Sequence, residues 1–257
     1  MTENILVTGG TGVLGRHVVD RFAKTGHPVR VLSRTREPYI GDLRTGAGLG
    51  PALEGVDTIV HLASDPRDSS ADVEAARRLI AATPPETHLV YVSIVGVDRH
   101  PYTYYRRKHE VERLIENSGL PYTILRTTQF HNLVVLMLGK LARSRVLPVP
   151  AGTDFQPVEV TEVAERLVEL ALGAPAGRVP DMGGPEIVSA AELARTYLRV
   201  TGGRGLVMPL PVPGRIAAAF RRGVHLAPDH PDGRGTFADF VSVAAGRSGY
   251  EAGTEGR

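Results

Sequence analysis

The first half of the chain alternates short apolar runs with longer segments in which apolar residues recur every three or four positions. The strand-like runs cover residues 5–7, 29–32, 58–60, 89–92 and 122–125, and the helical segments cover 13–24, 71–82 and 102–117. Apolar strands that alternate with helices predict parallel pairing, because each crossover helix must cover a face of the sheet. The pattern therefore predicts an α/β fold with a doubly wound parallel sheet.

The alternation loosens after about residue 146, where Pro and Gly become frequent. Helical spacing persists at residues 161–172, 189–200 and 213–221, separated by irregular connections. We expect a sheet-forming core over residues 1–146, to which later strands return, and a smaller C-terminal part over residues 147–257. Ligands of such sheets bind outside the carboxyl ends of the strands. Residues near 150–157 and 208–226 are therefore expected to cover that edge and to shape substrate choice.

Composition places the chain among ordinary globular proteins, with 257 residues, 42% hydrophobic and 23% charged. The net charge of +2 supplies no large excess of either sign, so neither nucleic acid nor an anionic membrane is expected as a partner. The absence of cysteine excludes disulfides and thiolate chemistry. No basic leader and no apolar run of the ~20 residues of a membrane helix is visible, so we expect a cytoplasmic protein. The expected partner is a small-molecule substrate.

A glycine-rich turn follows the first predicted strand. The segment Thr8-Gly9-Gly10-Thr11-Gly12-Val13-Leu14-Gly15 leads directly into a helix. Gly9 permits a tight turn, Gly12 lets the backbone approach a pyrophosphate, and Gly15 lets the helix pack closely on the strand. Phosphates would then lie at the positive end of the helix dipole. The turn predicts dinucleotide binding by Gly9, Thr11, Gly12, Val13, Leu14 and Gly15; a purely structural turn is the alternative.

The end of the second predicted strand lacks the acidic residue that commonly binds the 2′-hydroxyl of an adenosine ribose. The chain has Ser33-Arg34-Thr35-Arg36 there. A guanidinium pairs with a 2′-phosphate, whereas a carboxylate repels it, so Ser33 and Arg34 favour NADP (NADPH) over NAD. The alternative is that Arg34 and Arg36 are solvated surface charges.

Further segments complete a recognisable order along the chain. They are Gly41-Asp42-Leu43, His61-Leu62-Ala63-Ser64, Val92-Ser93-Ile94-Val95-Gly96, Tyr104-Tyr105-Arg106-Arg107-Lys108, Leu125-Arg126-Thr127-Thr128-Gln129-Phe130, and Gln156-Pro157-Val158 through Val163-Ala164. With the spacing Gly-x-x-Gly-x-x-Gly, this order resembles the extended and atypical branches of the short-chain dehydrogenase/reductase superfamily, and in particular its NmrA-like members. The resemblance covers residues 4–172 well.

The resemblance implies a Rossmann-type fold and NAD(P) binding. It implies cofactor contacts from the turn after the third strand, from the segment after the fourth, and from later strand ends. The residues concerned are Asp42, Leu43, Leu62, Ala63, Ser64, Ser93, Lys108 and Thr127. Lys108 is implied to hydrogen-bond the nicotinamide ribose.

Tyr104 and Lys108 form a candidate catalytic pair. Residues four apart on a helix share one face. A nearby ammonium lowers the pKa of a phenol, so Tyr104 is expected to act as general acid/base while a nicotinamide carries hydride. The alternative is a packed tyrosine and a surface lysine on an ordinary helix. Tyr102 and Tyr105 are competitors for the acid role but lack the four-residue offset from Lys108.

One position departs from the superfamily pattern. Extended members commonly have Ser or Thr two positions after Ser93, where this chain has Val95. The connection from Ser93 to Tyr104 is also short. Ser93 is therefore expected to be displaced from the site. The loop after the strand at 122–125 should run into the crevice; it contains Arg126, Thr127, Thr128 and Gln129. Contact with a cofactor or substrate and a purely structural role in the loop are two equal alternatives for these residues. The histidines lack the spacing of a metal site.

These observations predict an NADP-dependent oxidoreductase that acts on a small carbonyl, alcohol or activated double bond. A non-catalytic NADP-sensing regulator is the main alternative, favoured by Val95. A sugar-nucleotide epimerase-like enzyme is the second. The oligomeric state is left open by the sequence.

Overall fold

The computed structural model describes residues 4–65 and 68–254. The chain forms two compact units, each made of two separate stretches of sequence. The first unit holds Met1–Thr127 and Val160–Asp181, and the second holds Thr128–Glu159 and Met182–Arg257. Among the described residues, no helix is both long enough and apolar enough to cross a membrane.

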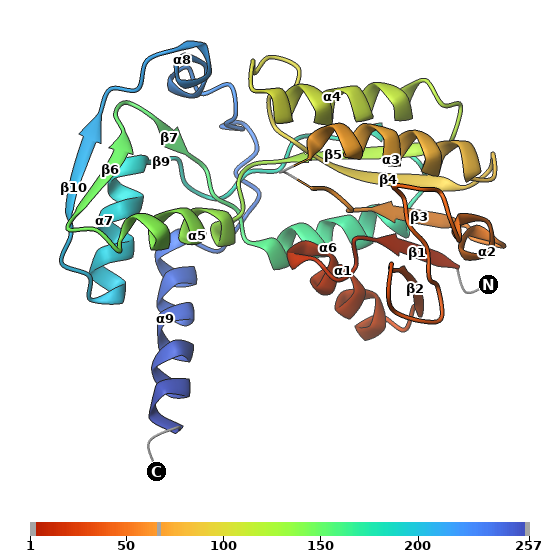
Figure 1. Ribbon diagram of the computed structural model, residues 1–257, viewed down its shortest axis with the longest axis horizontal. Coiled ribbons are helices and arrows are strands. Elements are labelled where there is room, and N and C mark those ends of the chain that lie inside the picture. Colours follow the sequence, from red (N-terminus) through yellow and green to blue (C-terminus); the bar gives the residue numbers. More distant parts are fainter. Residues whose placement is uncertain (1–3, 66–67, 255–257) are drawn as a thin grey trace. The chain divides into compact units, whose positions relative to one another are not determined.

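A six-stranded parallel sheet forms the centre of the first unit (Figure 1). Its strands are β1 Ile5–Thr8, β2 Val29–Leu32, β3 Thr58–His61, β4 His88–Ile94, β5 Tyr122–Thr127 and β8 Gly177–Arg178. They lie in the order β2-β1-β3-β4-β5-β8, and every neighbouring pair is parallel. The strand order reverses between β1 and β3, which defines the crevice at their carboxyl ends. The predicted doubly wound, Rossmann-type α/β fold is confirmed.

Helices cover both faces of this sheet (Figure 1). On one face α1 (Val13–Lys24) packs against α6 (Val160–Ala171), and α6 also contacts β3, β4 and β5. On the other face α3 (Ser69–Ala82) packs against α4 (Thr103–Glu116), and the short α2 (Leu49–Leu53) packs against α3. Buried side chains fill the layer beneath α3 and α4, among them Leu6, Ile59, Leu79, Leu89 and Ile115. Burial on both faces explains why the inner strands read as continuous apolar runs.

The second unit has two small sheets and its own core. β6 (Val146–Pro150) pairs in parallel with β10 (Leu206–Leu210), and β7 (Asp154–Phe155) pairs antiparallel with β9 (Val188–Ser189). Its helices are α5 His131–Leu141, α7 Ala190–Thr201, α8 Arg215–Arg221 and α9 Phe237–Thr254. Leu138, Leu147, Leu193 and Phe237 are buried together in its core.

Each unit is built from two stretches of sequence. Residues 128–146 belong to the second unit, while α6 and β8 return from later sequence to the first. The physical reason is that a parallel sheet must be covered on both faces. α6 buries Val163, Leu167 and Val168 and supplies part of that cover.

Candidate active site

The glycine-rich turn joins β1 to α1. Gly9 has a φ of +70°, and a Cβ there would lie 2.6 Å from the Ala63 nitrogen. A Cβ on Gly15 would meet the Gly9 carbonyl oxygen at 2.1 Å, so only glycine allows this close passage of helix and turn. Gly12 stands before α1 and no side chain caps the helix there. The first backbone N–H groups of α1 therefore have no capping side chain as acceptor, and uncapped groups of this kind stabilise an anion.

A cavity of about 710 Å³ opens beside this turn, at the carboxyl ends of β1, β2 and β3. Its volume falls within the range of roughly 300–1,000 Å³ that small-molecule and cofactor sites occupy. The predicted cofactor residues that line it are Gly9, Thr11, Gly12, Ser33, Arg34, Asp42, Leu43, Leu62, Ala63 and Ser64. The wall also includes residues outside the predicted set: Thr8, Leu32, Thr35, Arg36, Gly41, Arg44, Asp65, Ala71, Asp72 and Ala75. Several segments far apart in the sequence thus share one cavity.

The other predicted cofactor residues lie in the helix and sheet layers. Leu14 and Gly15 are buried in α1, which begins at the exposed Val13. Ser93, Lys108 and Thr127 are buried. Their contact with a cofactor stays a prediction.

Ser33 shapes the turn that presents two arginines to the cavity. Its Oγ accepts hydrogen bonds from the backbone nitrogens of Thr35 at 3.3 Å and Arg36 at 3.2 Å. Arg34 and Arg36 are exposed and line the cavity. Within residues 4–65 and 68–254, neither guanidinium has an ion-pair partner. Both positive charges are therefore available to an anionic ligand.

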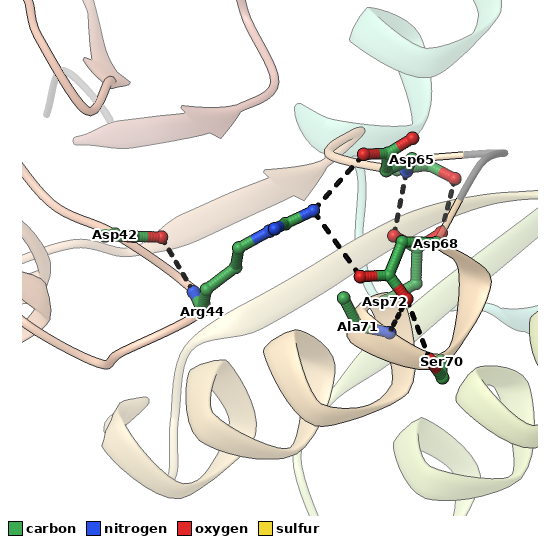
Figure 2. A network of polar contacts seen from close by, with 8 residues as sticks. Asp42, Arg44, Asp65, Asp68, Ser70, Ala71 and Asp72 are labelled. Carbon is green, nitrogen blue, oxygen red and sulfur yellow. Dashed lines mark hydrogen bonds and ion pairs between the residues drawn. The ribbon is translucent and has the colours of Figure 1, made fainter.

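Arg44, by contrast, has its charge balanced by two carboxylates (Figure 2). Its Nη2 lies 3.2 Å from Asp65 Oδ2 and 3.7 Å from Asp68 Oδ2, and its backbone nitrogen donates to Asp42 at 2.8 Å. Asp68 also accepts a hydrogen bond from the Ser70 hydroxyl, which together with the Ala71 N–H and Arg44 lowers the pKa of Asp68. The bridge joins the loop after β2 to the loop before α3, along the wall of the cavity.

Tyr104 lies in the first turn of α4 and reaches the loop after β3. Its hydroxyl is 3.2 Å from Ser64 Oγ, and Ser64 donates to Asp72 Oδ2 at 2.6 Å. Asp72 is in the first turn of α3 and also accepts a hydrogen bond from the Asp65 backbone nitrogen at 2.8 Å. Because Ser64 and Asp72 line the cavity, this chain of hydrogen bonds connects Tyr104 to its wall. Sequence reasoning missed Asp72, which reads there as one more acidic helix residue.

The electrostatics of Tyr104 differ from the expectation that an ammonium lowers the pKa of its phenol. Burial raises that pKa above its usual value of 10, and the charges of Asp72 and Tyr102 raise it further, whereas a hydrogen bond donated by Ser64 to the phenolate would lower it. Lys108 instead donates to the Val92 carbonyl at 3.0 Å and lies 4.3 Å from the centre of the Tyr91 ring. Tyr104 is thus kept as a protonated phenol, which suits a proton donor.

Lys108 is one turn after Tyr104 and is almost fully buried, with 5% of its surface exposed. Burial lowers the pKa of its ammonium to about 8, against the opposing effects of Asp72 and Glu112. The alternative of a surface lysine is therefore wrong. Near neutral pH the Lys108 amine is largely protonated and acts as a donor on the buried face of α4.

Val95, which replaces the Ser or Thr common in the superfamily, lies just after the carboxyl end of β4. Ser93 is 1% exposed, and its Oγ has no hydrogen-bond partner among the described residues. Val95 is also 1% exposed, and its backbone nitrogen donates to the Thr127 carbonyl at 3.0 Å. Neither side chain presents a hydroxyl to solvent at this strand end.

The sequence allows Arg126 either a ligand contact or a structural role, and the structure favours the structural role. Its guanidinium is bidentate to Glu112, with Nε–Oε1 at 2.9 Å and Nη2–Oε2 at 2.6 Å, and its Nη1 lies 2.7 Å from Asp98. The arginine is 4% exposed and Glu112 is 1% exposed. This buried cluster fastens α4 to β5 and so helps to fix the helix that carries Tyr104 and Lys108.

His61, at the end of β3, is buried with its imidazole neutral. Its Nδ1 lies 2.7 Å from Thr8 Oγ1, and its ring stacks on Tyr91 at a centroid distance of 5.6 Å. Burial, together with the positive charge of Lys108, lowers the pKa of His61 from 6.5 to about 3. Within the described residues, no group of histidines and acids is arranged to hold a metal ion.

We expect the protein to lose stability as the pH falls below 6.5, because unfolding frees His61 to take up a proton. The folded-state pKa is the lower one, so this stabilisation is fully present above 6.5 and is lost between 6.5 and about 3. By about pH 5 this single group costs about 2 kcal/mol of unfolding free energy. Urea unfolding at about pH 7.5 and about pH 5 measures the loss.

Two glutamine variants distinguish His61 from other titrating groups. The loss between the two pH values should shrink in His61→Gln and persist in His27→Gln, which removes a half-exposed imidazole. An undiminished loss in His61→Gln would show that other groups carry the acid sensitivity.

The comparisons with known proteins agree with this geometry. The family model for NAD(P)H-binding proteins matches residues 9–169. A (4-alkanoyl-5-oxo-2,5-dihydrofuran-3-yl)methyl phosphate reductase of Streptomyces griseus is 31% identical over 212 residues, which span 77% of this chain and 74% of the reductase. The chain belongs to the NAD(P)H-binding family, and a reductase is among its relatives. It is an NAD(P)-dependent enzyme.

Solved structures with low identity share the fold. A nucleoside-diphosphate-sugar epimerase from Staphylococcus aureus superposes with a TM-score of 0.77 at 18% identity, over 93% of this chain and 99% of that one. An NADPH-dependent quinone oxidoreductase from Escherichia coli, crystallised with NADPH, has a TM-score of 0.74 at 18% identity over the same shares. These similarities support the Rossmann-like architecture.

Proposed function

We propose that the protein is an NADP-dependent oxidoreductase that reduces or oxidises a small carbonyl, alcohol or activated double bond. The observation that carries the proposal is the cavity itself: it combines the glycine turn, the uncapped start of α1 and two guanidiniums that have no ion-pair partner in the described part of the chain. These groups suit a dinucleotide with an additional phosphate. The reductase from Streptomyces griseus and the NADPH complex of the quinone oxidoreductase are consistent with this chemistry.

The residues present fit the cofactor without rearrangement of the turn. Gly12 lines the cavity, where a side chain would stand between the backbone and a pyrophosphate. The N–H groups at the start of α1 would hold the phosphates, and Arg34 and Arg36 would pair with the 2′-phosphate. Arg44 is less suited to that role because Asp65 and Asp68 already balance its charge.

Proton transfer falls to Tyr104 in this proposal. The nicotinamide, when bound, supplies or accepts hydride. The phenol of Tyr104 is protonated at neutral pH and lies against the cavity wall through Ser64, so it can donate to a substrate oxygen during reduction. Lys108, held by the Val92 carbonyl and the Tyr91 ring, fixes this part of α4 and is the expected donor to the ribose.

Cofactor preference tests the proposal directly. We expect NADPH to bind about tenfold or more tightly than NADH, because a charge-assisted phosphate contact contributes roughly 1.5–3 kcal/mol. Arg34→Ala should remove most of this preference. Arg77→Ala is the matched control, because it removes an exposed arginine of α3 that pairs with Glu74. Titration calorimetry measures both affinities, and equal affinities in the wild-type protein would refute the NADP assignment.

A second function, NADP sensing without turnover, is favoured by the carboxyl end of β4. Ser93 is buried, and Val95 offers no hydroxyl where the superfamily commonly has one. A panel of carbonyls, alcohols and activated double bonds incubated with NADPH or NADP separates the two functions. Turnover of any member excludes the sensor, whereas cofactor binding without turnover across the panel favours it.

A further inference from the structure

We propose that Asp72, acting through the Ser64 hydroxyl, is a positioning residue that sets Tyr104 as a proton donor and returns a proton to it after each transfer. The inference rests on the proposed function of Tyr104 as the general acid. It concerns a carboxylate on a different helix from the Tyr104 and Lys108 pair.

Counting hydrogens fixes the direction of the contacts. The Ser64 hydroxyl has one hydrogen and lies 2.6 Å from Asp72 Oδ2, and an ionised carboxylate can only accept. The hydrogen of Ser64 is therefore committed to Asp72. At the 3.2 Å contact between Ser64 Oγ and the Tyr104 hydroxyl, Tyr104 must then be the donor. The resting arrangement runs from Tyr104 to Ser64 to Asp72, with the phenol protonated.

The backbone holds the carboxylate in this orientation. Asp72 Oδ1 accepts from the Asp65 nitrogen at 2.8 Å, which leaves Oδ2 for Ser64. Asp72 stands in the first turn of α3, where the helix dipole favours a negative charge, and α3 packs against α4. The arrangement is therefore built from two packed helices and one strand end.

The charged and titratable groups around Tyr104 make Asp72 the main anionic influence. Asp72 faces it from α3, Tyr91 faces it from β4, and Tyr102 lies beside it on α4. Lys108, also on α4, is engaged with Val92 and Tyr91. The carboxylate raises the pKa of the phenol, and because it holds the hydrogen of Ser64, that hydroxyl accepts from the phenol rather than donating to a phenolate.

The same series of hydrogen bonds replaces the proton of Tyr104 after it has been transferred. When the O–H bond of Tyr104 breaks and its proton joins a substrate oxygen, a phenolate remains. The half-buried Asp72 takes a proton from solvent water and passes it to Ser64 Oγ, as Ser64 gives its own hydrogen to the phenolate. The sum is one proton moved from solvent to Tyr104, with Ser64 and Asp72 restored.

Titration of the Tyr104 phenol tests the inference without a substrate. The protein is labelled with 13Cζ-tyrosine, and the Tyr104 resonance is assigned by its loss in Tyr104→Phe. Asp72→Asn should lower the titration midpoint by about one pH unit, the lower end of the effect of a neighbouring charge. Glu74→Gln removes an exposed carboxylate from the same helix and should leave the midpoint unchanged.

Ser64→Ala gives an independent check, because Ser64 is an exposed loop residue whose loss leaves the charge of Asp72 in place. It removes the oxygen that accepts the hydrogen of the phenol, so it should lower the midpoint, in the same direction as Asp72→Asn. The inference is overturned if the Asp72→Asn midpoint equals that of Glu74→Gln, or if Ser64→Ala raises the midpoint, which would make Ser64 the donor to Tyr104. A lower midpoint in both variants supports the positioning role even where no turnover is found, and that combination would count against the proposed function alone.

Discussion

Replacing Glu112 by glutamine is expected to lower the free energy of unfolding by about 3 kcal/mol. Removal of one partner of a buried ion pair costs ~3–5 kcal/mol, because the other charge stays buried without full compensation. Arg126 keeps Asp98 at 2.7 Å, which places the loss at the lower end of that range. Urea unfolding measures the change as a lower midpoint at constant slope.

Glu110 provides the matched control for this substitution. It lies on the same helix and pairs with Arg107 at 2.7 Å, but both side chains are about two-fifths exposed. Exposed pairs contribute about 0–1 kcal/mol, so Glu110→Gln should change stability little. If Glu112→Gln is no more costly than Glu110→Gln, the buried cluster does not fasten α4 to the sheet.

Tyr104→Phe is expected to reduce turnover by about 100-fold once a substrate is found, the usual scale of a positioned acid or base. Phenylalanine keeps the packing of the ring and removes only the transferable proton, so cofactor affinity should hardly change. Steady-state rates with NADPH and calorimetric titration of the cofactor measure the two quantities separately.

Tyr102→Phe is the control for Tyr104, since Tyr102 stands immediately before α4 and is exposed. It should retain nearly full turnover. Full rates in both Tyr104→Phe and Lys108→Met would mean that the pair is structural and that another group transfers the proton.

The sequence predicts the first unit well because its signals are local. The helix predicted at residues 13–24 is α1, and the one predicted at 102–117 is α4, Thr103–Glu116. Buried residues of α1, namely Leu14, Val18 and Phe22, recur every four positions, which is the spacing that indicates a half-buried helix. The glycine turn is equally local, since the conformation of each glycine depends on its immediate neighbours.

In the second unit the helices predicted at 189–200 and 213–221 are found as α7 and α8, whereas α5 and the short strands escape prediction for identifiable reasons. α5 carries exposed apolar residues, Leu133, Leu136 and Met137, so it shows no clear polar face. β6 and β10 each contain proline, as in Pro148 and Pro209, which reads in a sequence as a loop or an edge. These short strands pair with partners distant in the sequence.

In the candidate site, the residues that were missed are those whose role depends on contacts between distant segments. Asp72 becomes informative only when Ser64 and Tyr104 are placed beside it. Arg44 and Arg34 are both arginines in loops after β2, and the sequence does not distinguish them. Only the contacts of Arg44 with Asp65 and Asp68 show that its charge is balanced while that of Arg34 is available. Spacing along one chain carries no signal for either.

The return of α6 to the first unit has a consequence for the order of folding. α1 follows the glycine-rich turn directly, and it packs against a helix whose first residue, Val160, lies more than a hundred residues later. During synthesis the apolar face of α1 therefore stays uncovered until the intervening segment of the second unit has been made. Such long-range closure slows folding, because loop entropy is lost before the contacts form. The helix that follows the glycine-rich turn thus obtains its full cover only from residues made near the end of the first unit's sequence.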